Sequence, residues 1–403
     1  MAGNRSLVRA KKKKFDEFYT QYDDIQREVN AYLEYNPNVF KDKTVLLPCD
    51  DPEWSNFTKF FAQNFEMLGL KKLISTSFAA DSKKEYYEFK GSYQQFTLFD
   101  ITDFEKMDPN FNEHTTHKKG KIFTLTRRNK KVNISDLQWK YLEGDGDFRS
   151  SEISKLRDEV DMIITNPPFS LFTEFVEWIM EGKKEFLIIG NIGNITYKDI
   201  FNYIKNNKMW LGKGFYKGNA FFRVPTTNEH NYANGVYDDK TGLVKFRNCC
   251  WFTNLDHGRR HQHLNLMTMA DNIKFSKHKE IRAKGYVKYD NYDAIEVNFV
   301  DAIPSDYDGV MGVSSSFMEK YCPEQFEIIG ASQTGCHDDN MILRTYKDYK
   351  GYHQDGTLTG RTGSTCGHNP MIEKNDGIHD YYMNSEGRIV QSANGRVFIK
   401  RRK

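Results

Sequence analysis

Asp161-Met-Ile-Ile-Thr-Asn-Pro-Pro-Phe169 is the stretch that decides the fold. Its first part is a short apolar run, which is typical of a buried strand. Asn166-Pro167-Pro168-Phe169 then ends that strand, because two consecutive prolines lack N–H donors and hold the backbone extended. Ligands of open α/β sheets bind outside the carboxyl ends of the strands. The stretch therefore predicts a site at the end of a parallel strand.

The residues on both sides alternate between apolar runs and helical periodicity, which indicates a parallel sheet covered by helices. The expected elements are strand 44–49, a helix from Ser55 to Gly69, strands 72–77 and 139–142, helix 151–157, helix 171–180, strand 185–190, helix 197–205, and strands 209–211 and 250–253. We interpret residues 80–136 as a β-rich insertion with alternating segments at 86–89, 96–99 and 122–126.

After about Asp271 the composition shifts to glycine, tyrosine and polar residues, and only a short helix at 316–321 and strands 326–329 and 396–400 are expected. A chain of 403 residues exceeds the size at which single cores stop growing, about 250–300 residues. The fold class predicted is α/β, with a Rossmann-like catalytic domain over residues 1–275 and a loop-rich α+β domain over residues 276–403. Such a loop-rich surface favours recognition over cofactor binding.

Charge is unevenly distributed although the formal net charge is only +3. Lysines fill positions 11–14, the stretch 118–131 carries seven Lys/Arg and no acid, and the chain ends in Lys400-Arg401-Arg402-Lys403. Each run suits either a solvated face or phosphate contacts. The turn Arg127-Arg128-Asn129-Lys130-Lys131 is expected to point to solvent or to a nucleic acid.

The six cysteines form no C-x-x-C pair and follow no signal peptide, so a disulfide framework is not expected. Cys322, Cys336-His337 and Cys366-Gly367-His368 match no zinc-binding spacing, and we expect no metal. No stretch approaches the 18 apolar residues of a membrane span, and no apolar segment follows the basic start. We expect a cytoplasmic protein without a membrane partner.

The tetrapeptide suits chemistry on a planar amino nitrogen such as the 6-amino group of adenine. That nitrogen is a poor nucleophile, because its lone pair is delocalised into the ring. The Asn166 side-chain carbonyl and the Pro167 backbone carbonyl can accept its two N–H bonds and draw the lone pair outward. Phe169 offers a flat face for a flipped base. Pro168 helps to hold these acceptors in fixed directions.

The pattern as a whole resembles the EcoRI-type adenine-specific modification methylases. The matching stretches are Asp16-Glu-Phe-Tyr-Thr-Gln-Tyr22, Cys49-Asp-Asp-Pro52, Ser55-Asn-Phe57, Gly144-Asp-Gly-Asp-Phe-Arg-Ser150, Asn166–Phe172, Ile188-Ile-Gly-Asn191 and Trp251-Phe-Thr-Asn-Leu255. The resemblance implies site-specific transfer of a methyl group from S-adenosylmethionine to a flipped adenine in double-stranded DNA, by a bacterial or phage enzyme of a restriction-modification type. A monomer is favoured over an oligomer.

The resemblance also implies roles for individual residues. The amino-terminal cofactor segment would be Phe18, Tyr19 and Thr20, with Pro48, Cys49 and Asp50 beside the cofactor's methionine portion. Asp147 would accept from the cofactor's adenine amino group, and Phe148 would stack on that ring. Trp251 or Phe252 would lie on the other face of the target base. Independently of the resemblance, the charge of the basic turn leads us to expect that it contacts the DNA backbone through Arg127, Arg128, Lys130 and Lys131.

Two features depart from the pattern usual in methyltransferases. Asp50-Asp51-Pro52-Glu53 replaces the glycine-rich turn, and the second strand ends in Ser75-Thr76-Ser77 rather than in an acid. The acids of the turn could equally cap the helix after Ser55. Alternatives are methylation of RNA or of a protein glutamine, a cytosine-amino enzyme, whose tetrapeptide usually begins with Ser, and a catalytically silent DNA-binding protein.

Overall fold

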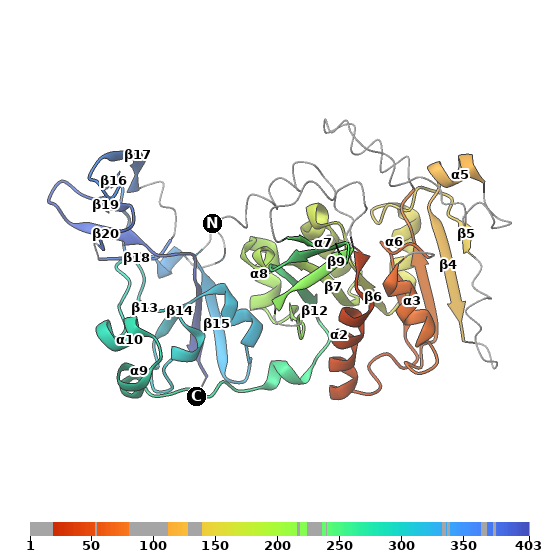
Figure 1. Ribbon diagram of the computed structural model, residues 1–403, viewed down its shortest axis with the longest axis horizontal. Helices are drawn as coiled ribbons and strands as arrows, with labels where there is room; N and C mark the ends of the chain where they lie inside the picture. Colours follow the sequence, from red (N-terminus) through yellow and green to blue (C-terminus); the bar gives the residue numbers. More distant parts are fainter. Residues whose placement is uncertain are drawn as a thin grey trace. The chain divides into compact units, whose positions relative to one another are not determined.

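The computed structural model describes residues 19–52, 55–79, 112–127, 139–215, 218–223, 236–238, 240–332, 336, 339–363, 369–373 and 376–402. The chain divides into two compact units (Figure 1). Unit 1 comprises Met1–Ile192 with Leu211–His257, and unit 2 comprises Gly193–Trp210 with Gly258–Lys403. Residues 193–210 and 258–275, which the sequence pattern groups with the catalytic domain, therefore belong to unit 2.

An eight-stranded sheet forms the centre of unit 1, in the order β5-β4-β3-β2-β6-β7-β12-β8. Its strands are β2 (Thr44–Leu47), β3 (Lys72–Thr76), β4 (Lys121–Thr126), β5 (Trp139–Tyr141), β6 (Met162–Thr165), β7 (Glu185–Asn191), β8 (Trp210–Leu211) and β12 (Cys249–Thr253). The strands β3, β2, β6 and β7 run parallel, whereas β4 pairs antiparallel with β3 and β12 antiparallel with β7. The parallel α/β prediction is confirmed, including the strand that precedes Asn166.

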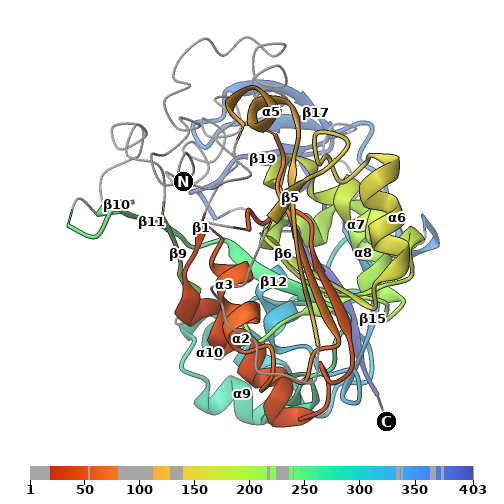
Figure 2. The ribbon, with the colours of Figure 1, turned by 90° about the vertical axis from the view of Figure 1, so that its right-hand side faces the viewer.

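Helices of unit 1 cover both faces of this sheet. They are α2 (Tyr22–Tyr35), α3 (Asn56–Gln63), α6 (Ser151–Glu159) and α7 (Phe172–Glu181), while α5 (Glu113–Lys118) lies at one end of β4 (Figure 1). The helices α2 and α3 lie on one face, and α6 and α7 on the other (Figure 2). Ser55 caps α3 as expected, since its hydroxyl accepts from the Phe57 N–H at 3.0 Å. The helix ends at Gln63, before the predicted stop at Gly69.

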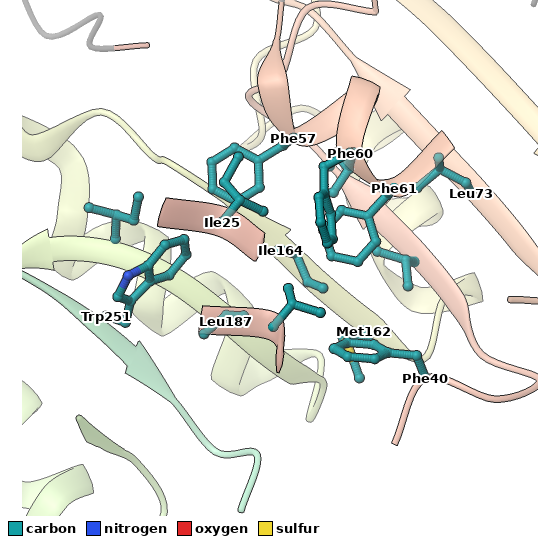
Figure 3. Packing of buried hydrophobic residues seen from close by; sticks show 14 of the residues in the cluster. Ile25, Phe40, Phe57, Phe60, Phe61, Leu73, Met162, Ile164, Leu187 and Trp251 are labelled. Atoms are coloured by element: carbon teal, nitrogen blue, oxygen red, sulfur yellow. The ribbon is translucent and has the colours of Figure 1, made fainter. Parts of the chain in front are cut away.

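Aromatic rings of α3 pack on alternate residues of the strands beneath them. Figure 3 shows Phe57, Phe60 and Phe61 over Ile164 of β6 and Leu187 of β7. All five side chains are at most 1% exposed. Because successive side chains of a strand point to opposite faces, the neighbours of these strand residues face α6 and α7 instead. This two-sided burial explains the near-continuous apolar runs of the sequence.

The strand order places a topological switch point at β2. From β2 the chain crosses to β3 on one side, and β6 later joins β2 on the other side. Open α/β sheets bind ligands at the carboxyl ends of the strands at such a point. We call this border of the sheet the carboxyl edge. The loop after β2 and the tetrapeptide after β6 both leave the sheet there.

The strand predicted at 122–126 exists as β4, but it is part of the main sheet rather than of a separate excursion. The alternating segments at 86–89 and 96–99 lie outside the described residues. A smaller sheet of unit 1 was not expected from the sequence. It consists of β1 (Tyr19–Thr20), β9 (Ala220–Arg223), β11 (Leu243–Phe246) and β10 (Tyr237–Asp238) in that order.

Unit 2 contains α8 (Lys198–Lys205), α9 (Met269–Phe275), α10 (Lys279–Lys284) and two sheets. One has the order β13-β14-β21-β15, with β13 (Ala294–Val297), β14 (Val310–Val313), β15 (Phe326–Ala331) and β21 (Val397–Arg401). The other has the order β17-β16-β19-β20-β18, with β16 (Lys350–Tyr352), β17 (Leu358–Thr362), β18 (Met371–Ile372), β19 (Tyr381–Met383) and β20 (Ile389–Ser392). The strands β15 and β21 were predicted, and the helix expected at 316–321 is a 3₁₀ helix, Ser315–Lys320.

Candidate active site

The tetrapeptide leaves the sheet directly after a fully buried strand. All four residues of β6 are buried, whereas Asn166, Pro168 and Phe169 are half-buried and Pro167 is buried. Pro168 is extended, with φ −55° and ψ 122°, and its carbonyl accepts from the Leu171 N–H at 3.0 Å. A short 3₁₀ turn then leads into α7. The geometry brings Asn166 to the carboxyl edge, where the sequence predicts it.

A buried carboxylate joins the ends of β2 and β6. Asp50 is 5% exposed, and its two oxygens accept hydrogen bonds from the hydroxyls of Ser55 and Thr165, each at 2.6 Å. Thr165 immediately precedes Asn166. Asp50 therefore links the strand that carries the tetrapeptide to the N-cap of α3. We name this arrangement of Asp50, Ser55 and Thr165 the Asp50 clamp.

The same loop is also tied to the end of β3. The Asp50 N–H donates to the Thr76 carbonyl at 3.1 Å, and the Thr76 hydroxyl donates to the Pro48 carbonyl at 3.1 Å. The second strand ends in Ser75 and Thr76, where methyltransferases usually have an acid. The two hydroxyls donate hydrogen bonds to backbone carbonyls of the loop after β2, those of Asp50 and Pro48.

Burial raises the pKa of Asp50 from its ordinary value of 3.8 to about 7, even though the hydrogen bonds from Ser55 and Thr165 lower it. Desolvation disfavours the charged form, and the two hydroxyls only partly compensate. The sequence allowed Asp50 either to contact a ligand or to cap α3, and its contacts in the structure are of the second kind. Both carboxylate oxygens are directed at protein hydroxyls, and Asp50 supports the cap of α3 through Ser55.

The loop Gly144–Asp147 closes on the end of β3 at the same edge. Gly146 has a φ of +85°, and a Cβ at this position would lie 2.1 Å from the Ser77 carbonyl oxygen. The Ala79 N–H also donates to the Asp145 carbonyl at 2.7 Å. Only glycine combines this backbone conformation with so close an approach. The loop is held there next to the Asp50 clamp.

The Asp147 carboxylate is paired with an arginine. The Arg149 guanidinium approaches its carboxylate at 2.6 and 2.9 Å, and the Arg149 N–H donates to it at 2.8 Å. Donation of hydrogen bonds to the Asp147 carboxylate raises the pKa of Arg149. The Asp147 side chain retains 20% exposure. A carboxylate has about four acceptor positions, so an amino group could still donate to it.

Phe148 occupies the core instead of the edge. Its ring is 4% exposed and lies 4.9 Å from the Phe175 ring and 5.7 Å from the Trp178 ring, centroid to centroid. In this arrangement neither ring face is open for stacking on a cofactor. A stacking role would require the ring to leave its contacts with α7. The sequence could not distinguish a buried Phe from an exposed one at the end of a loop.

Thr20 has the features expected of a ligand contact. It is 3% exposed, its carbonyl accepts from the Asn56 side chain at 2.7 Å, and its hydroxyl has no hydrogen-bond partner within the described ranges. Asn56 is the first residue of α3, so Thr20 lies beside the helix that starts at the Asp50 clamp. Tyr19 contributes its backbone to β1, pairing with Arg223. Phe18 lies outside the described residues.

The two aromatic candidates of β12 lie on opposite faces of the sheet, and both are buried. Trp251 is 1% exposed and stacks on Phe215 at 5.6 Å, while Phe252 is 0% exposed and packs on Phe172 at 4.9 Å. Neither ring faces the carboxyl edge with an open surface. Phe169 itself contacts the ring edge of Phe222, which comes from β9. The sequence pattern did not single out Phe222.

The basic turn begins at the other border of the sheet. Thr126 pairs with Lys72, the first residue of β3, so Arg127 lies at the border opposite the carboxyl edge. Its guanidinium contacts the Asp42 carboxylate at 2.6 Å and the Gly69 carbonyl. This position does not support a backbone contact beside a base held at Asn166. Arg128, Lys130 and Lys131 lie outside the described residues.

The described cysteines and histidines do not form a metal site. The part of the chain that is described contains no group of three or more His, Cys, Asp or Glu residues placed to hold a metal ion. The Cys322 thiol donates to the Glu324 carboxylate at 3.2 Å. His337, Cys366 and His368 are not among the described residues. Within the same ranges, no helix is long and apolar enough to cross a membrane.

Comparison with known proteins agrees with this architecture. The family model described as "Adenine-specific methyltransferase EcoRI" matches residues 6–401. The chain is 41% identical over 331 residues to the Type II methyltransferase M.EcoRI of Escherichia coli, covering 81% of this chain and 89% of that protein. No solved structure matches it.

Two further relatives are mycoplasmal. The chain is 34% identical over 323 residues to the Type II methyltransferase M.MgeORF184P of Mycoplasma genitalium and 33% identical over 324 residues to M.MpnI of Mycoplasma pneumoniae, covering 80% of this chain and 84% of each relative. The family match spans both units, so it is not confined to the sheet that carries the tetrapeptide. The chain belongs to the EcoRI family of adenine-specific methyltransferases.

Proposed function

We propose that the protein transfers a methyl group from S-adenosylmethionine to the 6-amino group of an adenine flipped out of double-stranded DNA. The observation that carries the proposal is the position of Asn166-Pro167-Pro168-Phe169 at the carboxyl end of β6, beside the switch point of the sheet. This is the place where open α/β sheets bind their ligands. The family membership supplies the adenine specificity.

In the proposed mechanism the protein orients an amino group and exposes its lone pair. The Asn166 side-chain carbonyl accepts one N–H of the adenine, and the Pro167 backbone carbonyl accepts the other. Phe169 stacks on the base, which offsets part of the cost of unstacking it from the duplex. S-adenosylmethionine supplies the electrophilic methyl group when it is bound. Once the N–C bond has formed, the nitrogen carries one proton too many and releases it to solvent water.

The donor would bind along the carboxyl edge between α3 and the Gly144–Asp147 loop. Thr20 supports this placement with a buried hydroxyl that lacks a partner among the residues described. The half-buried Cys49 and the backbone of the loop after β2 border the same region. Asp147 would accept from the adenine amino group of the donor through its remaining acceptor positions. Phe148 would contribute packing beneath that loop.

Substitution of Asn166 by Ala tests the catalytic assignment. We expect turnover on adenine to fall by at least about 100-fold, the effect typical of removing one preorganised hydrogen-bonding group. Binding of S-adenosylmethionine, measured by calorimetry, should persist, because Asn166 faces the target rather than the donor. Near-normal turnover in the variant would show that another group aligns the amino nitrogen. A wild-type protein that fails to bind the donor would instead indicate a catalytically silent protein.

We also propose that unit 2 reads the DNA sequence. Its hairpin of β16 and β17 supports this role, because β17 is an edge strand whose side chains are exposed or half-exposed throughout. A two-stranded ribbon fits the major groove, where Arg and Lys side chains pair with guanine. Arg361 on β17 and Lys350 on β16 are exposed. They provide the base-reading chemistry that unit 2 would need.

Point substitutions test this role better than truncation. Removing residues 276–403 would leave 193–210 and 258–275 without the rest of their compact unit. We expect Arg361→Ala to relax specificity at one position of the target, by about 1–3 kcal/mol of discrimination. Long-read sequencing of DNA from expressing cells would report the modified adenines and their sequence context. An unchanged motif at unchanged efficiency would exclude the hairpin from base reading.

A further inference from the structure

Strand β4 separates the described residues of the basic run at 118–131, so that its first lysines and Arg127 lie at opposite borders of the sheet. Lys118 and Lys119 precede β4, whereas Arg127 follows it. Because β4 runs antiparallel to β3, its beginning lies where β3 ends. Ile122 pairs with Thr76, and Thr126 pairs with Lys72. Lys118 and Lys119 therefore lie at the carboxyl edge, and Arg127 lies at the other border.

Figure 1 shows this arrangement, with α5 at one end of β4 and the arrow of the strand pointing away from it. The backbone of Ser77, just past β3, is tied to Lys121 at the start of β4. The Ser77 N–H donates to the Lys121 carbonyl at 3.0 Å, and the Lys121 N–H donates to the Ser77 hydroxyl at 3.1 Å. The end of α5 is thus attached to the same edge as the Asp50 clamp.

The residues around Lys119 are held in place. The Gly120 N–H donates to the Gly144 carbonyl at 3.0 Å, and a Cβ on Gly120 would lie 2.3 Å from the Ser77 carbonyl oxygen. The helix α5 is fixed by the Tyr141 hydroxyl, which lies 2.5 Å from the Thr116 hydroxyl oxygen. Lys118 and Lys119 consequently project from an anchored segment. Such anchoring lowers the conformational entropy lost when a lysine binds a partner.

The two lysines keep their charge available. Both are exposed, and neither forms an ion pair with any residue in the described ranges. Two acids on or beside the neighbouring loop accept hydrogen bonds. The Glu152 carboxylate accepts from the backbone N–H groups of Glu143 and Gly144, and the Asp145 carboxylate accepts from the Asp147 N–H. The Glu143 side chain, on the same loop, is exposed.

Sheet geometry sets the distance from these lysines to the tetrapeptide. The order β4-β3-β2-β6 puts three strand spacings between β4 and β6, or roughly 14 Å at about 4.8 Å per spacing. Phosphates of one DNA strand are spaced about 3.4 Å apart along the helix axis, so a duplex whose axis runs across these strands covers this distance in about four nucleotides. Arg127 lies a further six residues along β4, roughly 20 Å at about 3.4 Å per residue.

We propose that Lys118 and Lys119 bind backbone phosphates of the duplex about four nucleotides from the target adenine, and that Arg127 does not. The inference rests on the proposed placement of the target base at Asn166. Within one basic run it assigns the phosphate contact to the two lysines before β4 instead of to Arg127 after it. The physical reason is the antiparallel register of β4, which the sequence composition does not reveal.

The test compares two pairs of lysines at opposite borders of the same sheet. The first variant is Lys118→Gln with Lys119→Gln. The matched control is Lys41→Gln with Lys71→Gln, since both of these lysines are exposed and Lys71 directly precedes β3. Affinity for a random-sequence duplex is measured by fluorescence anisotropy over a series of salt concentrations. Both variants remove the same charge.

We expect the first variant to have a shallower slope of log affinity against log salt, by about 0.9 for each lost phosphate contact. At 0.1 M salt this slope corresponds to a loss of up to about eightfold in affinity per contact. The control pair should retain both slope and affinity. Unchanged binding in the first variant, or an equal loss in the control, would overturn the proposal.

The measurement separates this inference from the proposed function, because no methyl transfer is involved. If Asn166→Ala remains active, the catalytic proposal fails while the salt dependence still reports where the duplex is gripped. If Asn166→Ala is inactive and the Lys118 and Lys119 variant binds normally, the catalytic proposal stands and only the assignment of the phosphate contacts is wrong. Calorimetric binding of S-adenosylmethionine to each lysine variant confirms that the fold of unit 1 is intact.

Discussion

Replacing Thr165 by Val tests whether the Asp50 clamp positions the tetrapeptide. Thr165 is fully buried, and its hydroxyl donates to the Asp50 carboxylate at 2.6 Å. Val has a similar shape but cannot donate, so one oxygen of a buried carboxylate loses its partner. A hydrogen bond to a charged group contributes about 1.5–3 kcal/mol. A loss of about 2 kcal/mol lowers the melting temperature by about 4–8 °C in a unit of this size.

The effect on catalysis should be separable from the effect on stability. Thr165 directly precedes Asn166, so a shift at the end of β6 moves the catalytic carbonyl. Misplacement of a reacting group by about 1 Å can reduce turnover by about 100-fold. We expect kcat to fall about tenfold or more in single-turnover methylation at a temperature where the variant is folded. Donor affinity should change little by comparison.

Two controls make the result interpretable. Thr165→Ser restores the donor and should recover most of the lost turnover. Thr253→Val removes another buried hydroxyl of the same sheet, which donates to the Phe186 carbonyl at 2.7 Å and accepts from the Leu255 N–H at 2.9 Å, and it should cost about 2 kcal/mol in stability without changing kcat. If Thr165→Ser is as impaired as Thr165→Val, or if Thr165→Val retains full turnover, the positioning role of the clamp is refuted.

Three further predictions concern the same edge. Because the pKa of Asp50 is raised to about 7, the folded protein binds this proton more tightly than the unfolded chain. Stability should therefore fall as pH rises from about 4 to about 7, and denaturant unfolding of Asp50→Asn should show a flatter pH dependence across that window. Gly146→Ala should destabilise unit 1 by about 2 kcal/mol or more in thermal unfolding, whereas Gly144→Ala should be tolerated; equal melting of the two variants would contradict the assigned loop geometry. Asp147→Ala should weaken donor binding by about 10-fold to 100-fold in calorimetry while DNA affinity is retained, and an unchanged donor affinity would remove Asp147 from the cofactor site.

The elements around the tetrapeptide could be predicted from the sequence because their signals are local. Apolar runs mark β2, β6 and β7, helical spacing of Phe57, Phe60 and Phe61 marks α3, and consecutive prolines mark the end of β6. The short strands of unit 2 could not be predicted in this way. Several have only two to four residues, too few for a periodic pattern, and they are stabilised by pairing with distant segments.

The sequence by itself therefore determined the parallel α/β core, the exit of Asn166 at a strand end and the family to which these motifs belong. Tertiary structure decided what the surrounding residues do. An aromatic residue suits both a base-stacking site and a core, and only the burial of both faces of β12 shows that Trp251 and Phe252 are core residues. The sequence shows only that Asp50 is an acid, and its hydrogen bonds in the structure show that it joins Ser55 to Thr165. Lys119 and Arg127 share one basic run, and the antiparallel pairing of β4 separates them. Strand register and two-sided burial depend on residues that are far apart in the sequence, so composition and local periodicity do not predict them.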